Sequence, residues 1–169
     1  IVRALMMECL FGPVLSRRLG LSLGVDLLKY KTCNMDCVYC ELGRTSSLTE
    51  RRERFVSLEK VQREIESRSE EDFDHLTFAG SGEPTLSSDL GEIIRRSKRI
   101  VDVPVAVITN STLLTSPKVR SELAEADVVL PSLDAVTQST FERINRPVKG
   151  LLIEEIIEGL RAFRHEFSG

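Results

Sequence analysis

Three of the four cysteines lie in one run of eight residues, Cys33-Asn34-Met35-Asp36-Cys37-Val38-Tyr39-Cys40. Thiolates are the soft ligands of zinc and of iron–sulfur clusters, so this crowding indicates a shared metal centre. A structural zinc site requires a fourth protein ligand, whereas Cys9, His75 and His165 are scattered along the rest of the chain. A four-iron cluster fits three thiolates better, because one iron is then left open to bind a small molecule.

The CxxxCxxC spacing of this run, with Tyr39 before its last cysteine, resembles the cluster loop of the radical S-adenosylmethionine (SAM) superfamily. The resemblance covers nearly the whole chain. It implies that Cys33, Cys37 and Cys40 hold a 4Fe-4S cluster, whose fourth iron is chelated by the amino and carboxylate groups of SAM. Four stretches are similar to the archaeal and bacterial radical SAM proteins grouped with the wyosine-type tRNA-modifying synthases: Phe11-Gly12-Pro13, Ser16-Arg17-Arg18-Leu19-Gly20, Lys31-Thr32-Cys33 and Cys40-Glu41-Leu42-Gly43-Arg44-Thr45.

The resemblance also implies an activity. A one-electron reductant of the ferredoxin or flavodoxin type reduces the cluster, the C–S bond of SAM breaks, and a 5′-deoxyadenosyl radical abstracts hydrogen from a substrate. Similarity to the wyosine-type synthases suggests a tRNA base as that substrate. Three alternatives stay open: an activase that places a radical on a partner protein, a non-catalytic iron–sulfur protein for electron transfer, and a zinc-stabilised domain whose ligand set is one short.

Composition and charge fit the core of a cytoplasmic enzyme. With 169 residues, of which 41% are hydrophobic, the chain can bury one core. No apolar run reaches membrane-spanning length, so no membrane partner is expected, and a reducing, cytoplasmic setting suits free thiolates. Residues 1–54 contain nine Lys/Arg and six Asp/Glu, a balance of +3, although the whole chain carries −3. This basic part favours an anionic substrate, either tRNA or protein.

Apolar patterning predicts alternating strands and helices. Strands are expected at 21–28, 76–79, 105–108 and 127–130, where short apolar or β-branched runs occur. Helices are expected to begin at Ser57, at Asp89 with a capping box to Glu92, at Ser116-Pro117 and at 151. Such alternation is typical of an α/β fold with a parallel sheet. The resemblance specifies a partial (β/α) barrel of radical SAM type with about four βα units, in one core domain that spans 1–169 and is truncated at its C-terminal end.

Polar motifs follow each of the four predicted strands. The cysteine loop (residues 33–40) follows the first strand, and the other motifs are Gly80-Ser81-Gly82-Glu83-Pro84, Thr109-Asn110-Ser111 and Ser132-Leu133-Asp134. Because the carboxyl ends of parallel strands carry the active site of such folds, we expect the four motifs to meet. Each of the last three also fits an ordinary turn or helix cap.

The resemblance assigns these motifs to SAM. Residues 80–83, the GSGE loop, are similar to the family's GGE stretch with Ser81 in place of a glycine, and their backbone would receive the methionine amino group. Ser132 and Asp134 would contact the ribose, and Tyr39 would lie near the adenine. The expected SAM-binding set is Tyr39, Gly80, Ser81, Gly82, Glu83, Thr109, Asn110, Ser132, Asp134 and Arg143.

Other candidates have weaker support. Arg143 and Arg146 offer a planar fork to the SAM carboxylate or to a substrate phosphate, with surface pairing to Glu142 as the alternative. Arg17 and Arg18 present the same choice between substrate contact and solvent. We expect the remaining candidates to be structural or exposed: His75 near a strand start, His165 on the surface, and Cys9 as a buried small apolar residue.

Overall fold

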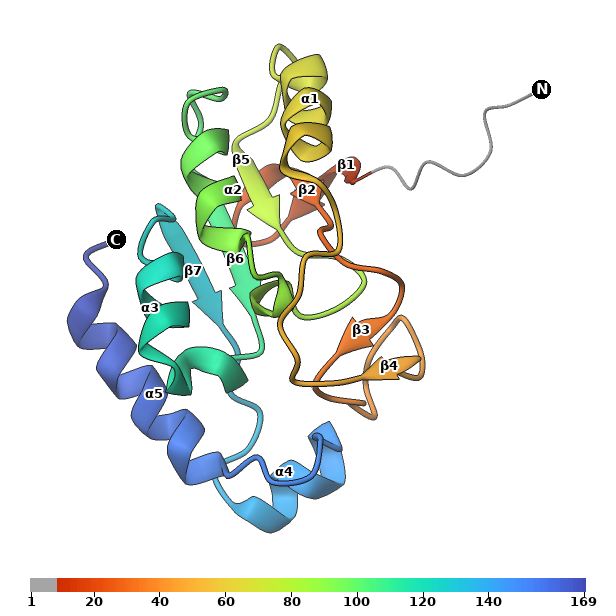
Figure 1. Ribbon diagram of the computed structural model, residues 1–169, viewed down its shortest axis with the longest axis vertical. Coiled ribbons are helices and arrows are strands. Elements are labelled where there is room, and N and C mark those ends of the chain that lie inside the picture. Colours follow the sequence, from red (N-terminus) through yellow and green to blue (C-terminus); the bar gives the residue numbers. More distant parts are fainter. Residues whose placement is uncertain (1–8) are drawn as a thin grey trace.

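The computed structural model of the protein describes residues 9–169. Its main feature is a five-stranded sheet with the strand order β1-β2-β5-β6-β7 (Figure 1). Strands β2, β5, β6 and β7 are parallel, and β1 is an antiparallel edge strand. A separate small sheet pairs two further strands in parallel, β3 and β4. The bounds are β1 Leu10–Ser16, β2 Gly20–Val25, β3 Thr32–Cys33, β4 Ser47–Leu48, β5 His75–Phe78, β6 Val105–Thr109 and β7 Val128–Pro131.

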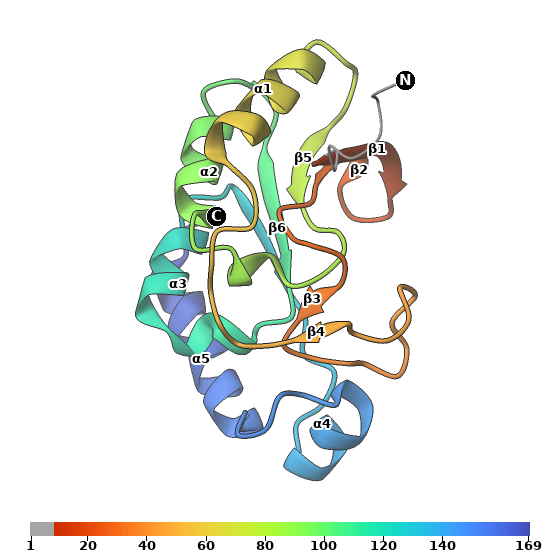
Figure 2. The same ribbon diagram turned by 45° about the vertical axis from the view of Figure 1, so that its right-hand side comes forward.

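Helices alternate with the parallel strands, as the sequence predicts. Figure 2 shows α1, α2 and α3 along one face of the sheet. Short 3-10 helices follow β5 and β6, and no helix in residues 9–169 is long and apolar enough to cross a membrane. The bounds are α1 Leu58–Arg68, η1 Pro84–Leu86, α2 Leu90–Ser97, η2 Thr112–Thr115, α3 Pro117–Leu123, α4 Gln138–Asn145 and α5 Ile153–Glu166.

The main core fills the space between the sheet and these helices. Alternate strand residues such as Phe78 and Val107 are fully buried there, and they belong to one apolar cluster with Ile65 of α1 and Ile94 of α2. Because successive strand residues point to opposite faces, the neighbours of these residues face away from the helices. Ile108, next to Val107, is 38% exposed. The sheet therefore has one covered face and one open face.

The sheet is strongly curved. Arg17 and Arg18, in the turn between β1 and β2, line the same cavity as Ile108 of β6 and Leu130 of β7. In the strand order, β5 separates the β1–β2 hairpin from β6. A flat sheet would keep these residues apart, so the shared cavity requires the sheet to curl as the wall of a barrel does.

Three predicted helix starts agree with the structure, because Ser57, Asp89 and Ser116 are the N-caps of α1, α2 and α3, but the predicted capping box of α2 does not form. The hydroxyl of Ser57 accepts the backbone N–H of Lys60, and α3 begins at Pro117. The predicted capping box is wrong, since the Asp89 side chain makes no cap bond. Its carboxylate pairs with Arg54, and Glu92 pairs along its own helix with Arg95 and Arg96.

Several elements have no counterpart in the sequence analysis, namely β1, β3, β4, η1, η2 and α4. Strand β1 passes through Gly12, whose φ of 88° lies in the left-handed region, and through Pro13, so its sequence is typical of a turn. A bulge between Phe11 and Val14 accommodates both residues. Helix α4 was not expected because its apolar positions, Phe141 and Ile144, are few.

Candidate functional site

The ends of β5 and β6 are joined by one buried carboxylate. Glu83 accepts hydrogen bonds from the backbone N–H (3.1 Å) and hydroxyl (2.6 Å) of Thr85, from the Thr109 hydroxyl (2.7 Å) and from the Asn110 N–H (2.7 Å). Burial raises the pKa of Glu83 above its usual 4.5, and the hydrogen bonds from Thr85, Asn110 and Thr109 act in the opposite direction. Glu83 thus fixes the third-strand motif relative to the GSGE loop.

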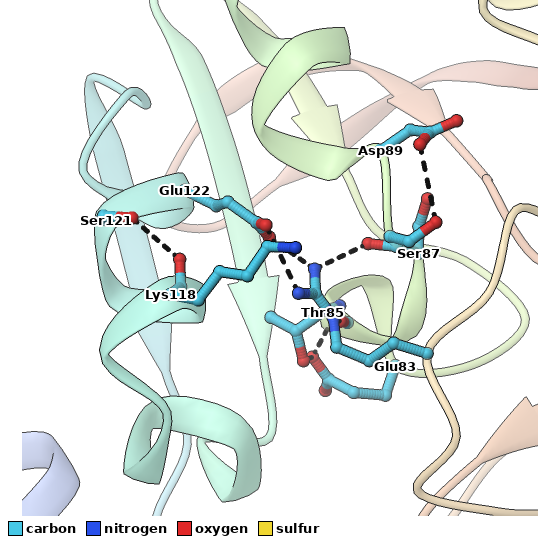
Figure 3. A network of polar contacts seen from close by, with 9 residues as sticks. Glu83, Thr85, Ser87, Asp89, Lys118, Ser121 and Glu122 are labelled. Carbon is cyan, nitrogen blue, oxygen red and sulfur yellow. Dashed lines mark hydrogen bonds and ion pairs between the residues drawn. The ribbon is translucent and has the colours of Figure 1, made fainter.

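A second network supports the same turn from outside. Figure 3 shows Glu83 and Thr85 beneath Ser87, with Glu122 of α3 on the opposite side. The guanidinium of Arg52 donates to the carbonyls of Thr85 (2.7 Å) and Ser87 (2.8 Å) and forms an ion pair with Glu122. The 3-10 helix after the GSGE loop is therefore tied to α3.

The GSGE loop lies directly against the start of the cysteine loop. A Cβ on Gly82 would stand 1.7 Å from the carbonyl oxygen of Thr32, and the Glu83 N–H donates to that same oxygen (3.2 Å). Only glycine allows the two backbones to approach so closely. Beside it, the Ser81 N–H donates to Asp26 (2.8 Å), while the Ser81 hydroxyl is buried without a hydrogen-bond partner within residues 9–169.

Two asparagines connect the cysteine loop to β6. The amide of Asn110 donates to the Asn34 side-chain oxygen (2.7 Å) and lies 3.7 Å from the sulfur of Cys33. Asn34, which is fully buried, donates in turn to the Thr112 hydroxyl (2.6 Å). The cysteine loop and the third-strand motif therefore form one hydrogen-bonded unit.

The other side of the cysteine loop is held by Asn145, the last residue of α4. Its buried amide lies within hydrogen-bonding distance of the Cys37 sulfur (3.4 Å), the Tyr39 hydroxyl (3.0 Å) and the Asp134 carboxylate (2.9 Å). Tyr39 also donates directly to Asp134. Backbone bonds from Asp36 to the Asn145 carbonyl and from Val38 to the Ile144 carbonyl complete the attachment.

The three thiols differ in their surroundings. All three cysteines are half-buried, and Cys33 and Cys37 pack against an apolar cluster that includes Met35 and Phe141. Burial, and next the nearby Glu83 carboxylate, raise the pKa of Cys33 to about 12. Within residues 9–169 no three His, Cys, Asp or Glu side chains are gathered closely enough to hold a single metal ion. In a cluster each thiolate binds a different iron, so the sulfurs need not converge on one point.

Most of the SAM-binding set expected from the sequence gathers around this loop. Asn110, Ser132 and Asp134 line one small cavity together with Met35 and Asn145. Ser132 is held through its carbonyl, which accepts the Ser111 hydroxyl (2.7 Å).

The other candidates lie elsewhere. Arg143 is exposed on α4, and no interaction within residues 9–169 ties it to the cysteine loop. His75 begins β5 and its Nδ1 lies 2.8 Å from the Leu19 carbonyl oxygen, which confirms a structural position. His165 is exposed and Cys9 is buried in the main core, as predicted.

Sequence reasoning missed three residues of this site. Asp26 binds the GSGE loop, Asn34 binds the third-strand motif, and Asn145 binds the cysteine loop. Asp26 interrupts the apolar run that predicts a strand at 21–28, and Asn34 lies between Cys33 and Cys37, so the positions of both were usable signals. Asn145 is 108 residues from Cys37, and no local pattern marks it.

These residues fit a 4Fe-4S cluster with a bound small molecule. Three thiols share one loop, a close backbone contact at Gly82 fixes the neighbouring loop, and the buried Ser81 hydroxyl has an unused hydrogen-bonding capacity. Apolar side chains on one side of the loop and hydrogen-bonded amides on the other suit a cluster site, where burial and bonds to sulfur set the properties of the iron.

A curved parallel sheet with a three-cysteine loop at its carboxyl edge defines the radical SAM class of proteins. The family model described as the Radical SAM superfamily matches residues 27–168, and the chain belongs to that superfamily. This confirms the family that the cysteine spacing predicted.

Two relatives illustrate how the chain relates to longer proteins. It is 41% identical over 167 residues to the UPF0026 protein MJ1312 of Methanocaldococcus jannaschii, covering 96% of this chain and 52% of that protein. It is 42% identical over 161 residues to the protein named GTPase Obg of Brachyspira hyodysenteriae, covering 94% of this chain and 24% of that protein. The chain thus spans about half, or less, of the length of these curated relatives.

One solved structure confirms the fold. The crystal structure of archaeal TYW1 matches with a TM-score of 0.57 and 17% sequence identity, over 85% of this chain and 51% of that chain. The predicted α/β fold with a partial barrel of radical SAM type is therefore correct.

Proposed function

We propose that this chain is the core of a radical SAM enzyme that cleaves SAM reductively and abstracts hydrogen from a substrate. The observation that carries the proposal is the direct contact between the GSGE loop and the cysteine loop, where Gly82 leaves no room for a side chain against Thr32. This contact puts the proposed SAM-binding backbone beside the proposed cluster ligands. Both halves of the reaction then share one site.

Each residue has a defined part in this proposal. Cys33, Cys37 and Cys40 would hold the cluster, which when bound supplies the electron that breaks the C–S bond of SAM. The amides of Asn110 and Asn145 would fix the positions of Cys33 and Cys37. The remaining expected contacts to SAM are the backbone of residues 80–83 and the side chains of Tyr39, Thr109, Asn110, Ser132, Asp134 and Arg143.

The Glu83 side chain would act through other residues and not touch SAM. It is fully enclosed, and its oxygens are occupied by Thr85, Thr109 and Asn110. Its part is to hold Asn110 and the GSGE loop at a fixed spacing. Water exclusion would come from the apolar cluster of Met35, Phe141 and Ile153 behind the cysteines.

The reductant and the substrate follow from the same proposal. A ferredoxin- or flavodoxin-type protein in a reducing compartment such as the cytoplasm would supply the electron. The basic balance of residues 1–54 supports an anionic substrate, and a tRNA base is the substrate we propose on the similarity to wyosine-type synthases.

The test is formation of 5′-deoxyadenosine. The protein would be reconstituted anaerobically with iron and sulfide, reduced, mixed with SAM and analysed by mass spectrometry. We expect 5′-deoxyadenosine from the unaltered chain and from Cys9→Ala, whose cysteine lies in the main core, but none from Cys37→Ala. Bound iron and sulfide without 5′-deoxyadenosine from the unaltered chain would contradict the proposal and favour an electron-transfer protein.

A further inference from the structure

A cavity of about 450 Å³ lies on the open face of the sheet, away from the helices. Its lining residues come from opposite parts of the sheet: Ser16, Arg17 and Arg18 from the β1–β2 hairpin, and Ile108, Leu130 and Ser132 from β6 and the end of β7. This volume is within the usual range for small-molecule sites. Ser132 belongs also to the small cavity beside the cysteine loop, so the two cavities share a residue.

Two unpaired cations line this cavity. Arg17 and Arg18 are exposed, and within residues 9–169 neither forms a hydrogen bond or an ion pair. On the helix side, in contrast, Arg52, Arg95 and Arg120 all pair with glutamates. The Asp74 carboxylate, which lies beside Gly20 of the hairpin, is engaged with the backbone N–H of Leu21 (2.7 Å). Within the described part of the chain, two adjacent guanidinium groups without a carboxylate partner are thus available to a ligand.

The cavity lining is mostly polar, and its aliphatic part, here called the floor, is formed by Ile108 and Leu130. Ile108 is 38% exposed and Leu130 is half-buried, whereas Val107, which points to the helices, is fully buried. An aliphatic floor beside two arginines suits a molecule with an uncharged part and an anionic group. Guanidinium groups bind phosphate through paired, charge-assisted hydrogen bonds, which makes a phosphate the matching anion.

We propose that this cavity binds a phosphate ester, with the phosphate on Arg17 and Arg18 and the uncharged part over Ile108 and Leu130. In this orientation the ester extends toward Ser132, the strand end at which we place SAM. The ligand would be the substrate of the proposed radical SAM reaction, and to that extent the inference rests on the proposed function. Binding itself requires neither the cluster nor SAM.

The experiment measures binding of phenyl phosphate to the whole chain by calorimetry, with methyl resonances of Ile108 and Leu130 observed by NMR. Phenol and inorganic phosphate are the reference probes. The double variant Arg17→Gln/Arg18→Gln is compared with Arg99→Gln/Arg164→Gln, which removes the same charge from exposed positions outside the cavity. A third variant, Ile108→Glu, puts a negative charge on the cavity floor. Thermal unfolding would show that each variant is folded.

We expect phenyl phosphate to bind more tightly than either reference probe and to shift both methyl resonances. Its dissociation constant should rise about tenfold or more in Arg17→Gln/Arg18→Gln and in Ile108→Glu, and stay unchanged in Arg99→Gln/Arg164→Gln. Equal affinity in the two double variants would overturn the proposal, since binding would then follow net charge alone. Unshifted Ile108 and Leu130 methyl groups at saturation would also overturn it.

The source of the phosphate is tested by comparing uridine 5′-monophosphate with a short RNA oligonucleotide. Tighter binding of the RNA, still dependent on Arg17 and Arg18, would support an RNA phosphate, and equal binding would support a free phosphate ester. The outcomes for the two proposals are separable. Phosphate binding without 5′-deoxyadenosine formation would contradict the proposed function and leave the cavity as a phosphate site. Formation of 5′-deoxyadenosine without phosphate binding would contradict only the proposal for the cavity.

Discussion

The helix-covered face of the sheet and the carboxyl edge both contain fully buried residues, but of opposite kinds. On the covered face, Leu76, Phe78 and Val107 are fully buried in an entirely apolar cluster. At the carboxyl edge, Asn34, Glu83 and Asn145 are no more than 2% exposed, and each makes several hydrogen bonds.

The difference separates stability from function in this molecule. Burying polar groups costs free energy unless all of them are paired, so an apolar core is the simpler way to stabilise a fold. A polar network that joins the cysteine loop, the GSGE loop and β6 stabilises the fold little more than apolar packing would, but it fixes the relative positions of those elements. We therefore attribute the fold to the covered face and the proposed chemistry to the edge.

The largest effect is expected from truncation on the covered face. Phe78→Ala should lower the free energy of unfolding by about 3–5 kcal/mol, because a fully buried ring leaves a cavity. Ile108→Ala, on the open face of the same sheet, should cost about 1 kcal/mol or less, because its side chain is already 38% exposed. Urea unfolding measures both, and equal losses would contradict the distinction between the two faces.

At the edge, the largest effect is expected at Gly82. Gly82→Ala should lower stability by about 2–3 kcal/mol, because its Cβ would overlap the Thr32 carbonyl and push the cysteine loop aside. Iron uptake and SAM binding should fall with it. Gly43→Ala is the control, since Gly43 has a φ of 76° but no atom within 4 Å, and it should cost only about 1 kcal/mol of backbone strain. Equal stability of the two variants would show that residues 80–83 form an ordinary turn.

The pH dependence of the free energy of unfolding tests the part that Glu83 plays at the carboxyl edge. Its pKa is raised above 4.5 in the folded state, so the folded protein holds this proton more firmly than the unfolded chain does. Its contribution to stability is therefore full below pH 4.5 and is lost as the pH rises through the folded pKa. Glu83→Gln should remove this dependence of the free energy of unfolding on pH. The variant should also lower that free energy by about 1–3 kcal/mol, because its NH₂ group would face the Asn110 N–H, which needs an acceptor. Urea midpoints across this pH range measure the slope.

The exposed Glu154→Gln serves as the control for that experiment and should leave the pH dependence as it is in the unaltered protein. A Glu83→Gln variant with the same slope as the unaltered protein would show that another group causes it.

The smallest effect is expected where the cysteine loop meets α4. Asn145→Ala should cost about 1–2 kcal/mol and speed amide hydrogen exchange in residues 33–40, because three side-chain contacts are lost while the backbone bonds at Asp36 and Val38 remain. Tyr39→Phe removes only the hydroxyl and should cost about 0.5–1 kcal/mol. Exchange rates unchanged in Asn145→Ala would mean that the backbone alone holds the loop.

The sequence predicts the covered face well because its signals are local. Runs such as 76–79 and 105–108 are apolar, and they become β5 and β6 with shifts of one residue at most. Strand β1 was missed because Gly12 and Pro13 suggest a turn, and only pairing with β2 makes it extended. The capping box failed because Asp89 and Glu92 find arginine partners that no three-residue pattern includes.

Only some of the residues at the carboxyl edge of the sheet could be predicted from the sequence. The cysteines, Glu83, Thr109 and Asn110 lie in motifs at strand ends, so their meeting follows from the order of the strands. Asn145 reaches Cys37 across 108 residues, and its approach depends on where α4 packs. The cavity of Arg17, Ile108 and Leu130 depends likewise on sheet curvature, which no local pattern encodes.

The central claim is that the cysteine loop and the GSGE loop form one site for a cluster and SAM. Its most direct test is the electron paramagnetic resonance spectrum of the reconstituted, reduced protein, recorded before and after SAM is added. We predict a reduced 4Fe-4S signal that changes on addition of SAM, because SAM would bind the iron that lacks a protein ligand. A cluster signal that SAM at saturating concentration leaves unchanged would contradict the claim.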